Sequence, residues 1–423
     1  MKLEANEADG QYMHDYVKEA GGFTRSPGSA GERRGAELTA EKMQEFADEV
    51  NIEEFEFAPK AALGWIKFIV PLFFVALFVF YIAPVLSALI MLFSLLVIVG
   101  QFVFYRKIVD PFFPKAKSQN VYSKNNPSED TRQTIIFAGH IDSPYQFNFI
   151  KWWGGRVYTI LMVLVIVTFI FFSITSISNG IAHVAEFFNY DWGGIVGGDN
   201  WLHTRWIISI CLSPVTALFF FFTTWKDTPG CGDNLSGVAV ALGVGNALNR
   251  AKQNGGFYPR HTRVITMGFG AEESFLRGAM AYVDAHKEEL KEQKVTLINM
   301  ETLVEPGDFF VLKKDLNGTV KMTSHVVDDV IRAAKEKGLN MKKISMPFGG
   351  GSTDSAAFAR AGIDTTCIFG VDLGKIIKGT GYFNHYHTDR DTPDKVKPKA
   401  LQQVLDVCLQ YLQDKDEEVS KLN

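Results

Sequence analysis

The chain has 423 residues, of which 47% are hydrophobic, and a formal net charge of −4. This length allows one large catalytic domain and a membrane part, and the nearly balanced charge excludes the basic surface typical of nucleic-acid binding, so no nucleic-acid partner is expected. The four cysteines have no paired spacing, which predicts free thiols in a reducing compartment rather than zinc fingers or disulfides.

Residues 1–60 form the first polar segment, which we assign to the beginning of the catalytic domain. Residues 1–10 are polar and acidic, unlike a secretory signal. Apolar residues recur at helical spacing between Ala30 and Val50, whereas residues 51–57 alternate between apolar and acidic side chains. This pattern predicts a helix followed by a strand.

Four apolar stretches interrupt the polar sequence, each close to the ~20 residues that a helix needs to cross a bilayer. They are Gly64–Tyr81, Ala83–Phe104, Val157–Ile177 and Trp206–Thr224. Residues 163–172 and 219–222 present no polar face, which argues against helices buried in a soluble core. We therefore predict two transmembrane hairpins, residues 61–107 and 151–226, with four membrane helices.

Basic residues next to the apolar stretches predict the orientation in the membrane. On the side of the polar segments they are Lys60, Lys67, Arg106, Lys107, Lys115, Lys117, Lys151, Arg156 and Lys226. The loop between the third and fourth stretches instead carries Glu186, Asp191 and Asp199. Because positively charged loops stay in the cytoplasm, we predict an integral, multi-pass membrane protein with its catalytic domain on the cytoplasmic side.

Residues 108–150 and 227–423 complete the catalytic domain. The strands predicted there are Asn120–Tyr122, Thr134–Ala138, Arg263–Phe269, Val295–Met300 and Thr365–Phe369. The predicted helices are Asn234–Asn249, Ser274–His286, Ser324–Lys337, a short helix from Ser355 and Lys399–Leu412. This alternation predicts an α/β fold, a mainly parallel mixed sheet with helices on both faces, interrupted by the two hairpins.

Imidazole and carboxylate side chains occur where predicted strands end or in loops, and one site could collect them at the carboxyl edge of the sheet. They are His140, Asp142, Asp233, Glu272, Glu273, Glu301 and His387. Nitrogen and oxygen ligands suit zinc, and less well manganese or cobalt. Two histidines and three carboxylates are enough for two ions about 3.5–4 Å apart that share a bridging carboxylate.

Each of these residues also has a purely structural explanation. His140 could bond only to backbone, Asp233 could cap the following helix, and Glu272 and Glu273 could be acids of a first helical turn. The order of the whole set along the chain and its placement near strand ends favour the metal site.

These motifs resemble those of the co-catalytic zinc peptidases of the aminopeptidase Y and bacterial leucyl aminopeptidase type, relatives of glutamate carboxypeptidase II. The matching stretches are Arg25–Glu32, His140–Asp142, Asp233–Gly237, Glu272–Glu273, Asn299–Glu301, Gly350–Asp354 and His387–Thr392. The resemblance implies two zinc ions, with Asp233 as the bridging ligand. His140 and Glu301 would bind one ion, and Glu273 and His387 the other.

The resemblance also implies roles outside the ligand set. Glu272 would be the general base, and Asp142 would orient His140. Glu301 stands where many relatives have aspartate, so the geometry at its ion is the least certain. We expect Asp354 and Asp391 to fix loops near the site, and we assign no ligand role to His385 or Cys231.

The sequence therefore predicts a membrane-embedded zinc peptidase acting on peptides, with an aminopeptidase as the leading hypothesis. A carboxypeptidase or dipeptidase could use the same site, and a glutaminyl cyclase would need one metal rather than two. An inactive receptor or scaffold is disfavoured because every expected ligand and the base are retained. The sequence predicts neither the preferred substrate side chain nor the oligomeric state.

The hairpins depart from the soluble relatives, which join the counterparts of His140 and Asp233 by a short loop. Only about 15 residues separate Asp142 from the third apolar stretch, and extended chain spans at most ~3.5 Å per residue. We hypothesise that the hairpins hold the active site near the lipid surface and shape its entrance, with simple anchoring as the alternative.

Overall fold

The computed structural model describes residues 3–190, 198–378 and 380–421. Asp191 and the side chain of Asp199, on which the predicted orientation partly depends, lie outside the described residues. The chain divides into two compact units. The sheet unit consists of Met1–Pro59, Lys115–Gln146 and Trp225–Asn423, and the helical unit consists of Lys60–Pro114 and Phe147–Thr224.

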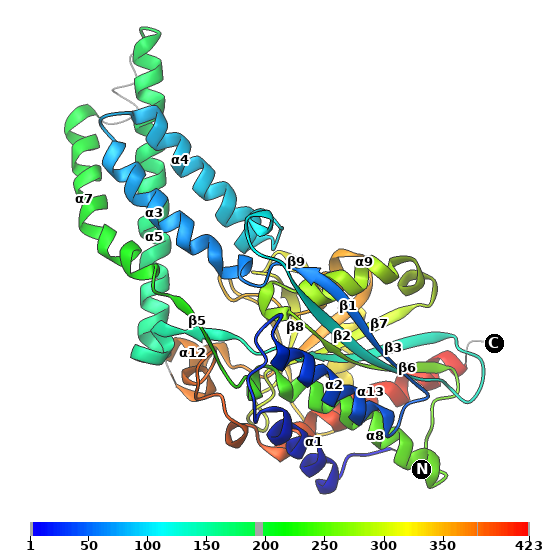
Figure 1. Cartoon of the computed structure of the whole chain (residues 1–423). Helices are drawn as coiled ribbons and strands as arrows, with labels where there is room; N and C mark the ends of the chain where they lie inside the picture. Colours follow the sequence, from blue (N-terminus) through cyan, green and yellow to red (C-terminus); the bar gives the residue numbers. More distant parts are fainter. Residues whose placement is uncertain (1–2, 191–197, 379, 422–423) are drawn as a thin grey trace. The chain divides into compact units, whose positions relative to one another are not determined.

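The sheet unit is built on nine strands (Figure 1). They are β1 (Glu49–Phe57), β2 (Ala116–Asn125), β3 (Gln133–His140), β6 (Thr262–Phe269), β7 (Val295–Glu301), β8 (Phe310–Asp315), β9 (Val320–Lys321), β10 (Lys342–Ser345) and β11 (Asp364–Phe369). Their order is β1-β2-β6-β3-β7-β11-β8-β10, with β9 paired to β8. The central strands β6, β3, β7 and β11 run parallel, whereas β1 and β2 pair antiparallel, which confirms the mainly parallel mixed sheet.

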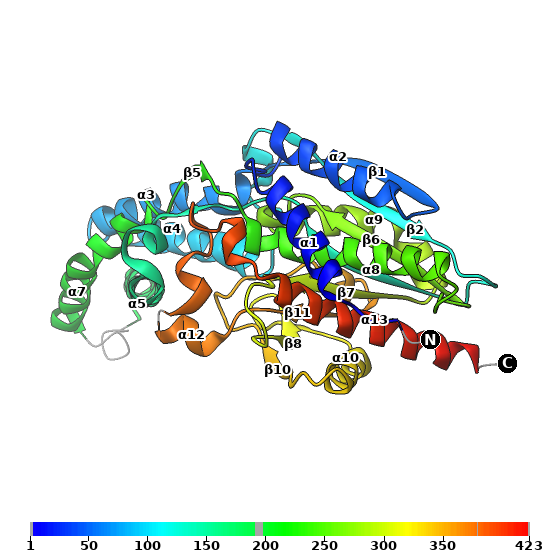
Figure 2. The same ribbon diagram turned by 90° about the horizontal axis from the view of Figure 1, so that it is seen from below.

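Helices cover both faces of this sheet. They are α1 (Glu7–Ala20), α2 (Ala30–Gln44), α8 (Ser236–Gln253), α9 (Arg277–Glu292), α10 (Ser324–Glu336), α11 (Ser355–Arg360) and α13 (Pro398–Ser420), while the short helix α12 (Leu373–Lys378) contacts the turn Gly381–Asn384. Short helical turns lie at Cys231–Leu235, Glu272–Ser274, Gly381–Asn384 and Pro393–Lys395. Figure 2 shows α1, α8 and α13 side by side.

The alternation of side chains along β3 explains the two layers. Ile135 and Phe137 belong to a core shared with α1, α2, α8, α10 and α13. Ile136 and Ala138 belong to a second core shared with α9 and α11. Because both faces are buried, the strand consists of apolar residues without a polar face, as expected for a parallel strand at the centre of a sheet.

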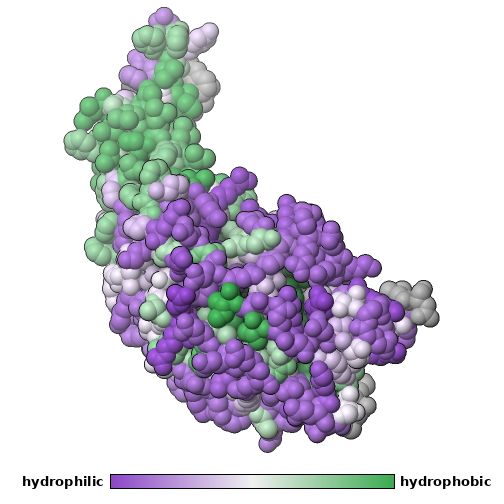
Figure 3. All heavy atoms as spheres, turned by 45° about the vertical axis from the view of Figure 1, so that its right-hand side comes forward, coloured by the Kyte–Doolittle hydropathy of each residue, from purple (hydrophilic) through white to green (hydrophobic). Residues whose placement is uncertain are grey.

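The helical unit contains four long helices. They are α3 (Ala61–Val79), α4 (Pro84–Val97) with its π-helical continuation Ile98–Val103, α5 (Asn148–Phe187) and α7 (Gly198–Phe219), and a short 3-10 turn lies at Asp110–Phe112. All four are long and apolar enough to cross a membrane. In Figure 3, hydrophobic residues cover the surface of this unit, whereas the visible face of the sheet unit is mainly hydrophilic.

Polar groups of the helical unit bond to one another in its interior. Ser87 and Ser176 lie 2.6 Å apart through their hydroxyls, and Asn179 donates to the carbonyl of Phe80 at 2.8 Å. Large apolar side chains such as Phe78, which is 75% exposed, point outward. Apolar outside and polar inside is the distribution that a lipid environment favours.

Two of the four long helices have bounds that differ clearly from the sequence-based expectation. The third apolar stretch extends to residues 148–187, although Gly154, at φ 77°, interrupts the helical backbone near its beginning. The fourth ends at Phe219 rather than Thr224, and residues 223–227 form strand β5 (Thr223–Asp227), which pairs with β4 (Tyr145–Phe147). Backbone pairing therefore decides the end of the fourth helix, which hydropathy alone misplaced.

Candidate metal centre

The carboxyl ends of the parallel strands bring the predicted residues to one edge of the sheet. His140 ends β3 opposite Phe269 of β6, and Glu301 ends β7. Glu272 and Glu273 follow β6 in the turn that leads to α9. Since parallel strands begin and end together, residues more than a hundred positions apart become neighbours.

His140 is oriented by Asp142 and faces three carboxylates. Its Nδ1 lies 3.1 Å from the carbonyl oxygen of Asp142 and 3.3 Å from its Oδ1. These oxygens only accept, so Nδ1 of the neutral ring carries the proton and Nε2 presents its lone pair. Nε2 lies 3.3 Å from Asp233 Oδ1, 3.4 Å from Glu301 Oε1 and 3.7 Å from Glu272 Oε2.

Asp233 lies between the two histidines. Its Oδ1 faces His140, and its Oδ2 lies 3.0 Å from Nε2 of His387. Nε2 of His387 is also 3.5 Å from Oε1 of Glu273. Asp233 therefore offers one oxygen to each side of the centre, with Glu301 on the side of His140 and Glu273 on the side of His387.

Burial and like charge control the pKa values of the acids. Burial, reinforced by neighbouring carboxylates, raises the pKa of Glu272 and of Glu273 well above its ordinary range and that of Glu301 to about 8. Burial also acts on Asp233, but hydrogen bonds from His140 and His387 outweigh it and lower its pKa. The centre is thus a buried excess of negative charge that favours a cation.

Unsatisfied oxygens support the fit of metal ions. Oε2 of Glu301 and both carboxylate oxygens of Asp354 are buried and have no hydrogen-bond partner among the described residues. A buried carboxylate without a partner is costly unless a cation or a proton compensates it. Imidazole nitrogens and carboxylate oxygens in this arrangement are the ligands that zinc uses in proteins. The residues present therefore fit zinc.

Residues 220–412 match the family model described as peptidase family M28. This segment, which is less than half of the chain, is similar to peptidase family M28. No curated protein sequence matches this chain. The family match, together with the fold comparisons below, confirms the predicted resemblance and the enzyme class, a zinc metallopeptidase.

Solved structures share the fold of the whole chain. The zinc aminopeptidase BSAP from Bacillus subtilis has a TM-score of 0.56 at 15% identity, covering 98% of this chain and 96% of its own. The aminopeptidase from Aneurinibacillus sp. strain AM-1 has a TM-score of 0.53 at 12% identity, and the match covers 96% of this chain and 93% of its own. The Bacteroides thetaiotaomicron glutaminyl cyclase has a TM-score of 0.54 at 12% identity, and the match covers 97% of this chain and 99% of its own. At these identities the likeness shows the fold.

Two carboxylates outside the predicted ligand set hold the loops that carry Glu272, Glu273 and Asp233. Asp142 accepts the backbone N–H of Glu272 and of Glu273, each at 3.0 Å. Asp391 accepts the N–H groups of Gly232 at 2.8 Å and Asp233 at 3.1 Å, as expected for a loop-fixing residue. Each of these two loops is therefore held by a buried acceptor that belongs to a distant part of the chain.

Two supporting residues lie in the stretch 25–32, to which the sequence assigned no individual role. Arg25 is fully buried and donates to five carbonyl oxygens, those of Ala20, Phe23, Ile141, Pro229 and Gly230. Glu32 accepts the N–H of Ala271 at 2.8 Å, directly before Glu272. The only signal of these supporting roles in the sequence was the presence of two charged residues, Arg25 and Glu32, in a stretch that resembles the family.

The remaining predicted neighbours do not act as ligands in this arrangement. Cys231 is fully buried, its sulfur packs close to Gly21, and burial raises the pKa of its thiol. His385 forms no ion pair with the centre's carboxylates within the described ranges, and burial lowers its pKa. Asp354 faces the charges of His140 and Glu301 rather than a hydrogen-bonding loop, so its predicted loop-fixing role finds no hydrogen bond in the described part of the chain.

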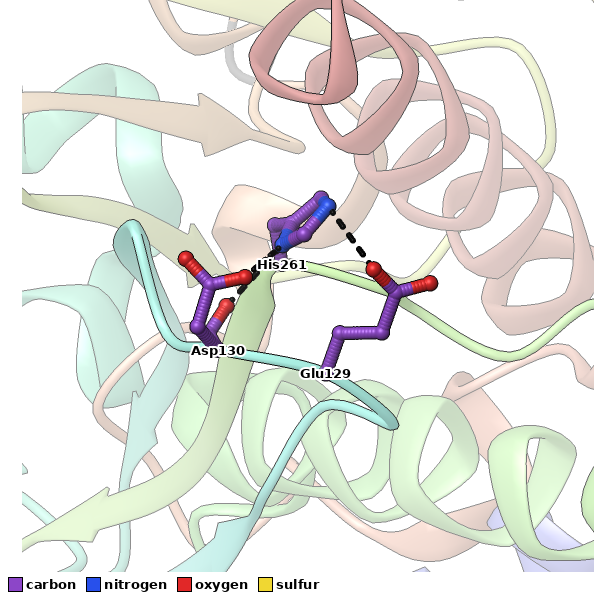
Figure 4. Close-up of side chains that lie close together, drawn as sticks. All are labelled: Glu129, Asp130 and His261. Carbon is purple, nitrogen blue, oxygen red and sulfur yellow. Dashed lines mark hydrogen bonds and ion pairs between the residues drawn. The ribbon is translucent and has the colours of Figure 1, made fainter. Parts of the chain in front are cut away.

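A second group of ligand types, Glu129, Asp130 and His261, lies elsewhere in the sheet unit (Figure 4). His261 Nδ1 lies 2.8 Å from Asp130 Oδ1, and its Nε2 lies 3.4 Å from Glu129 Oε2. Both acids are exposed and already paired with arginine, Glu129 with Arg260 at 2.7 Å and Asp130 with Arg132 at 2.9 Å. This group is a surface ion-pair network with its charge balanced.

Proposed function

We propose that this chain is a membrane-embedded, zinc-dependent aminopeptidase that hydrolyses the N-terminal bond of peptides. The observation that supports it most is the position of Asp233 between His140 and His387, with Glu301 and Glu273 on opposite sides. We assign His140 and Glu301 to one zinc ion, Glu273 and His387 to the other, and Asp233 to both. Asp233 is the natural bridge because each of its oxygens faces one imidazole.

When bound, the zinc pair supplies a Lewis acid for the substrate carbonyl and lowers the pKa of water. Glu272 is the general base. As a carboxylate it takes a proton from the attacking water and passes that proton to the leaving amine, and burial, which raises its pKa, makes it a stronger base. Asp142 fixes the backbone N–H of Glu272 at 3.0 Å and keeps the carboxylate in place for that transfer.

The charge of the centre favours a free amino terminus over a free carboxylate as the recognised end. No lysine or arginine within the described ranges forms an ion pair with Asp142, Asp233, Glu272, Glu273 or Glu301. Arg25, which is fully buried, donates to carbonyl oxygens and not to these acids. An ammonium group is attracted to this surplus of acids, whereas a substrate carboxylate is repelled.

We further propose that the four long helices of the helical unit cross a lipid bilayer with the sheet unit on the cytoplasmic side. Support comes from their length and composition and from the basic residues at their ends on the side of the polar segments. Labelling of single cysteines introduced at Lys107 and Asn189 with an impermeant maleimide tests the orientation in intact cells. Labelling at Lys107, but not Asn189, before lysis would contradict it.

The activity is tested on the full chain in detergent with a panel of peptides that are free or blocked at either end, together with metal analysis. We expect two zinc ions per chain and hydrolysis only of peptides with a free amino terminus. Hydrolysis that instead requires a free carboxyl terminus would identify a carboxypeptidase. One ion with cyclisation of N-terminal glutamine would identify a glutaminyl cyclase, the activity named for two structures of the same fold.

A further inference from the structure

A cavity of about 280 Å³ lies in the sheet unit, between the loops that follow β7 and β11 and the turn Gly381–Asn384. Its walls include the apolar side chains of Val304 and Phe383, the carboxylates of Glu305 and Asp372, and the ion pair of Asp308 with Lys375. Pockets for drug-sized ligands begin at about 300 Å³. This cavity therefore has room for one amino-acid side chain rather than for a whole peptide.

The cavity adjoins the metal centre. A Cβ atom added to Gly232, the residue before the bridging Asp233, would lie 2.7 Å from Cγ1 of Val304 and 2.4 Å from Oη of Tyr382, and both residues line the cavity. Gly370, also in its wall, donates to the carbonyl of Glu301 at 2.9 Å. The cavity is thus one residue away from each of two proposed ligands, Asp233 and Glu301. The side chain next to the scissile bond of a bound substrate would extend into this cavity.

The charges of the cavity are unbalanced. Among the described residues of its wall, Lys375 is the only basic one, and its Nζ is paired with Asp308, which raises the pKa of Lys375. Glu305 and Asp372 form no ion pair within the described ranges, and Asp372 accepts only the N–H of Gly374, at 2.7 Å. Two of the three acids thus lack a cation of their own.

We propose that this cavity receives the side chain of the N-terminal substrate residue and selects lysine and arginine. Val304 and Phe383 contact the aliphatic stem, and Asp372 and Glu305 bind the charged end, because long basic side chains bury their stems while their heads seek water or anions. The inference rests on the proposed aminopeptidase activity and names the substrate class of that same site.

The test measures kcat/KM of the full-length, zinc-loaded protein in detergent on the fluorogenic amides of lysine, arginine, leucine and glutamate. We expect lysine and arginine to exceed leucine by at least about tenfold, as for a charge-assisted contact. Asp372→Asn should reduce kcat/KM for the lysine and arginine amides about tenfold and leave kcat/KM for the leucine amide within about twofold of the wild type. Glu305→Gln should reduce kcat/KM for the lysine and arginine amides only about threefold, because Glu305 is exposed and its charge is screened by solvent.

Asp284→Asn is the matched control, since Asp284 is an exposed acid of α9 that does not line the cavity. A preference of the wild type for leucine, or a lysine preference that survives Asp372→Asn, would overturn the inference while leaving the peptidase intact. If the wild type hydrolyses no member of the panel, the proposed function fails. In that case, calorimetric titration with lysinamide and leucinamide tests the selectivity of the cavity. Equal affinities for the two amides would overturn the inference, whereas tighter binding of lysinamide that Asp372→Asn abolishes would support it.

Discussion

Asp142→Asn is the substitution that most directly probes how the metal centre is held. Oδ1 of Asp142 lies 3.3 Å from Nδ1 of His140 and accepts the N–H of Glu272 at 3.0 Å, while Oδ2 accepts the N–H of Glu273 at 3.0 Å. Asparagine offers one oxygen and one NH₂ group. Whichever way the amide turns, its NH₂ group faces an N–H donor, and at least one buried donor loses its acceptor.

The magnitude follows from that loss. A buried donor left without its acceptor costs about 1–3 kcal/mol. At 1.4 kcal/mol for each factor of ten, this corresponds to a factor of about 5 to 150. Removing the carboxylate partner of a metal-bound histidine lowers metal affinity about 10–100-fold, which is the same range. We therefore expect zinc affinity to fall about 10–100-fold, with kcat reduced even at saturating zinc because Glu272 loses its backbone anchor.

The assay is a competitive zinc titration against a fluorescent chelator, performed on the full chain in detergent, followed by kcat measurement at saturating zinc. Asp284→Asn makes the same chemical change on an exposed face of α9 and should leave both quantities unchanged. Zinc affinity of Asp142→Asn within twofold of the wild type would refute the argument that this carboxylate orients His140 and the loop of Glu272.

Glu272→Gln should lower kcat/KM by about 10²–10⁴ with zinc content unchanged, and loss of zinc instead would identify Glu272 as a ligand. Removal of zinc with a chelator should lower the melting temperature, because Glu301 and its buried neighbours then repel one another, and added zinc should restore it; an unchanged melting temperature would contradict the metal site. Burial raises the pKa of Asp315 to about 6, so its stabilising contribution is complete below about pH 3.8 and is lost as the pH rises through 6. Between these pH values, deprotonation of Asp315 should lower the unfolding free energy of the wild type by an amount on the order of 3 kcal/mol. Asp315→Asn should abolish this decrease, and melting curves with the same pH slope as the wild type would disprove the prediction.

The central part of the fold was predictable because its strands are buried on both faces. β3 contains the apolar run Ile135–Ala138, and β6, β7 and β11 are rich in apolar and β-branched residues, so strands between predicted helices have few other interpretations. The same reasoning predicted the neighbourhood of His140 and Glu301, since parallel strands end at the same edge.

Short strands near the edge of the sheet escaped prediction for the opposite reason. β8 contains two adjacent exposed lysines, Lys313 and Lys314, and β10 begins with Lys342 and Lys343. Charged residues are common on edge strands because they discourage pairing with other chains, but they also remove the hydrophobic signal from the sequence. Their strand conformation depends on pairing with neighbours that local pattern does not reveal.

The hydrogen bonds that hold the centre come from all three polar segments of the sheet unit. Glu32 precedes the first apolar hairpin, Asp142 lies between the hairpins, and Asp391 follows the second. Each is a buried carboxylate that accepts backbone N–H groups of a ligand-bearing loop or of its immediate neighbour. Such contacts span up to 239 positions, so no local pattern could predict them. Because the two insertions fall between these anchors rather than inside the anchored loops, the chain can carry long apolar hairpins without altering the positions of its proposed ligands.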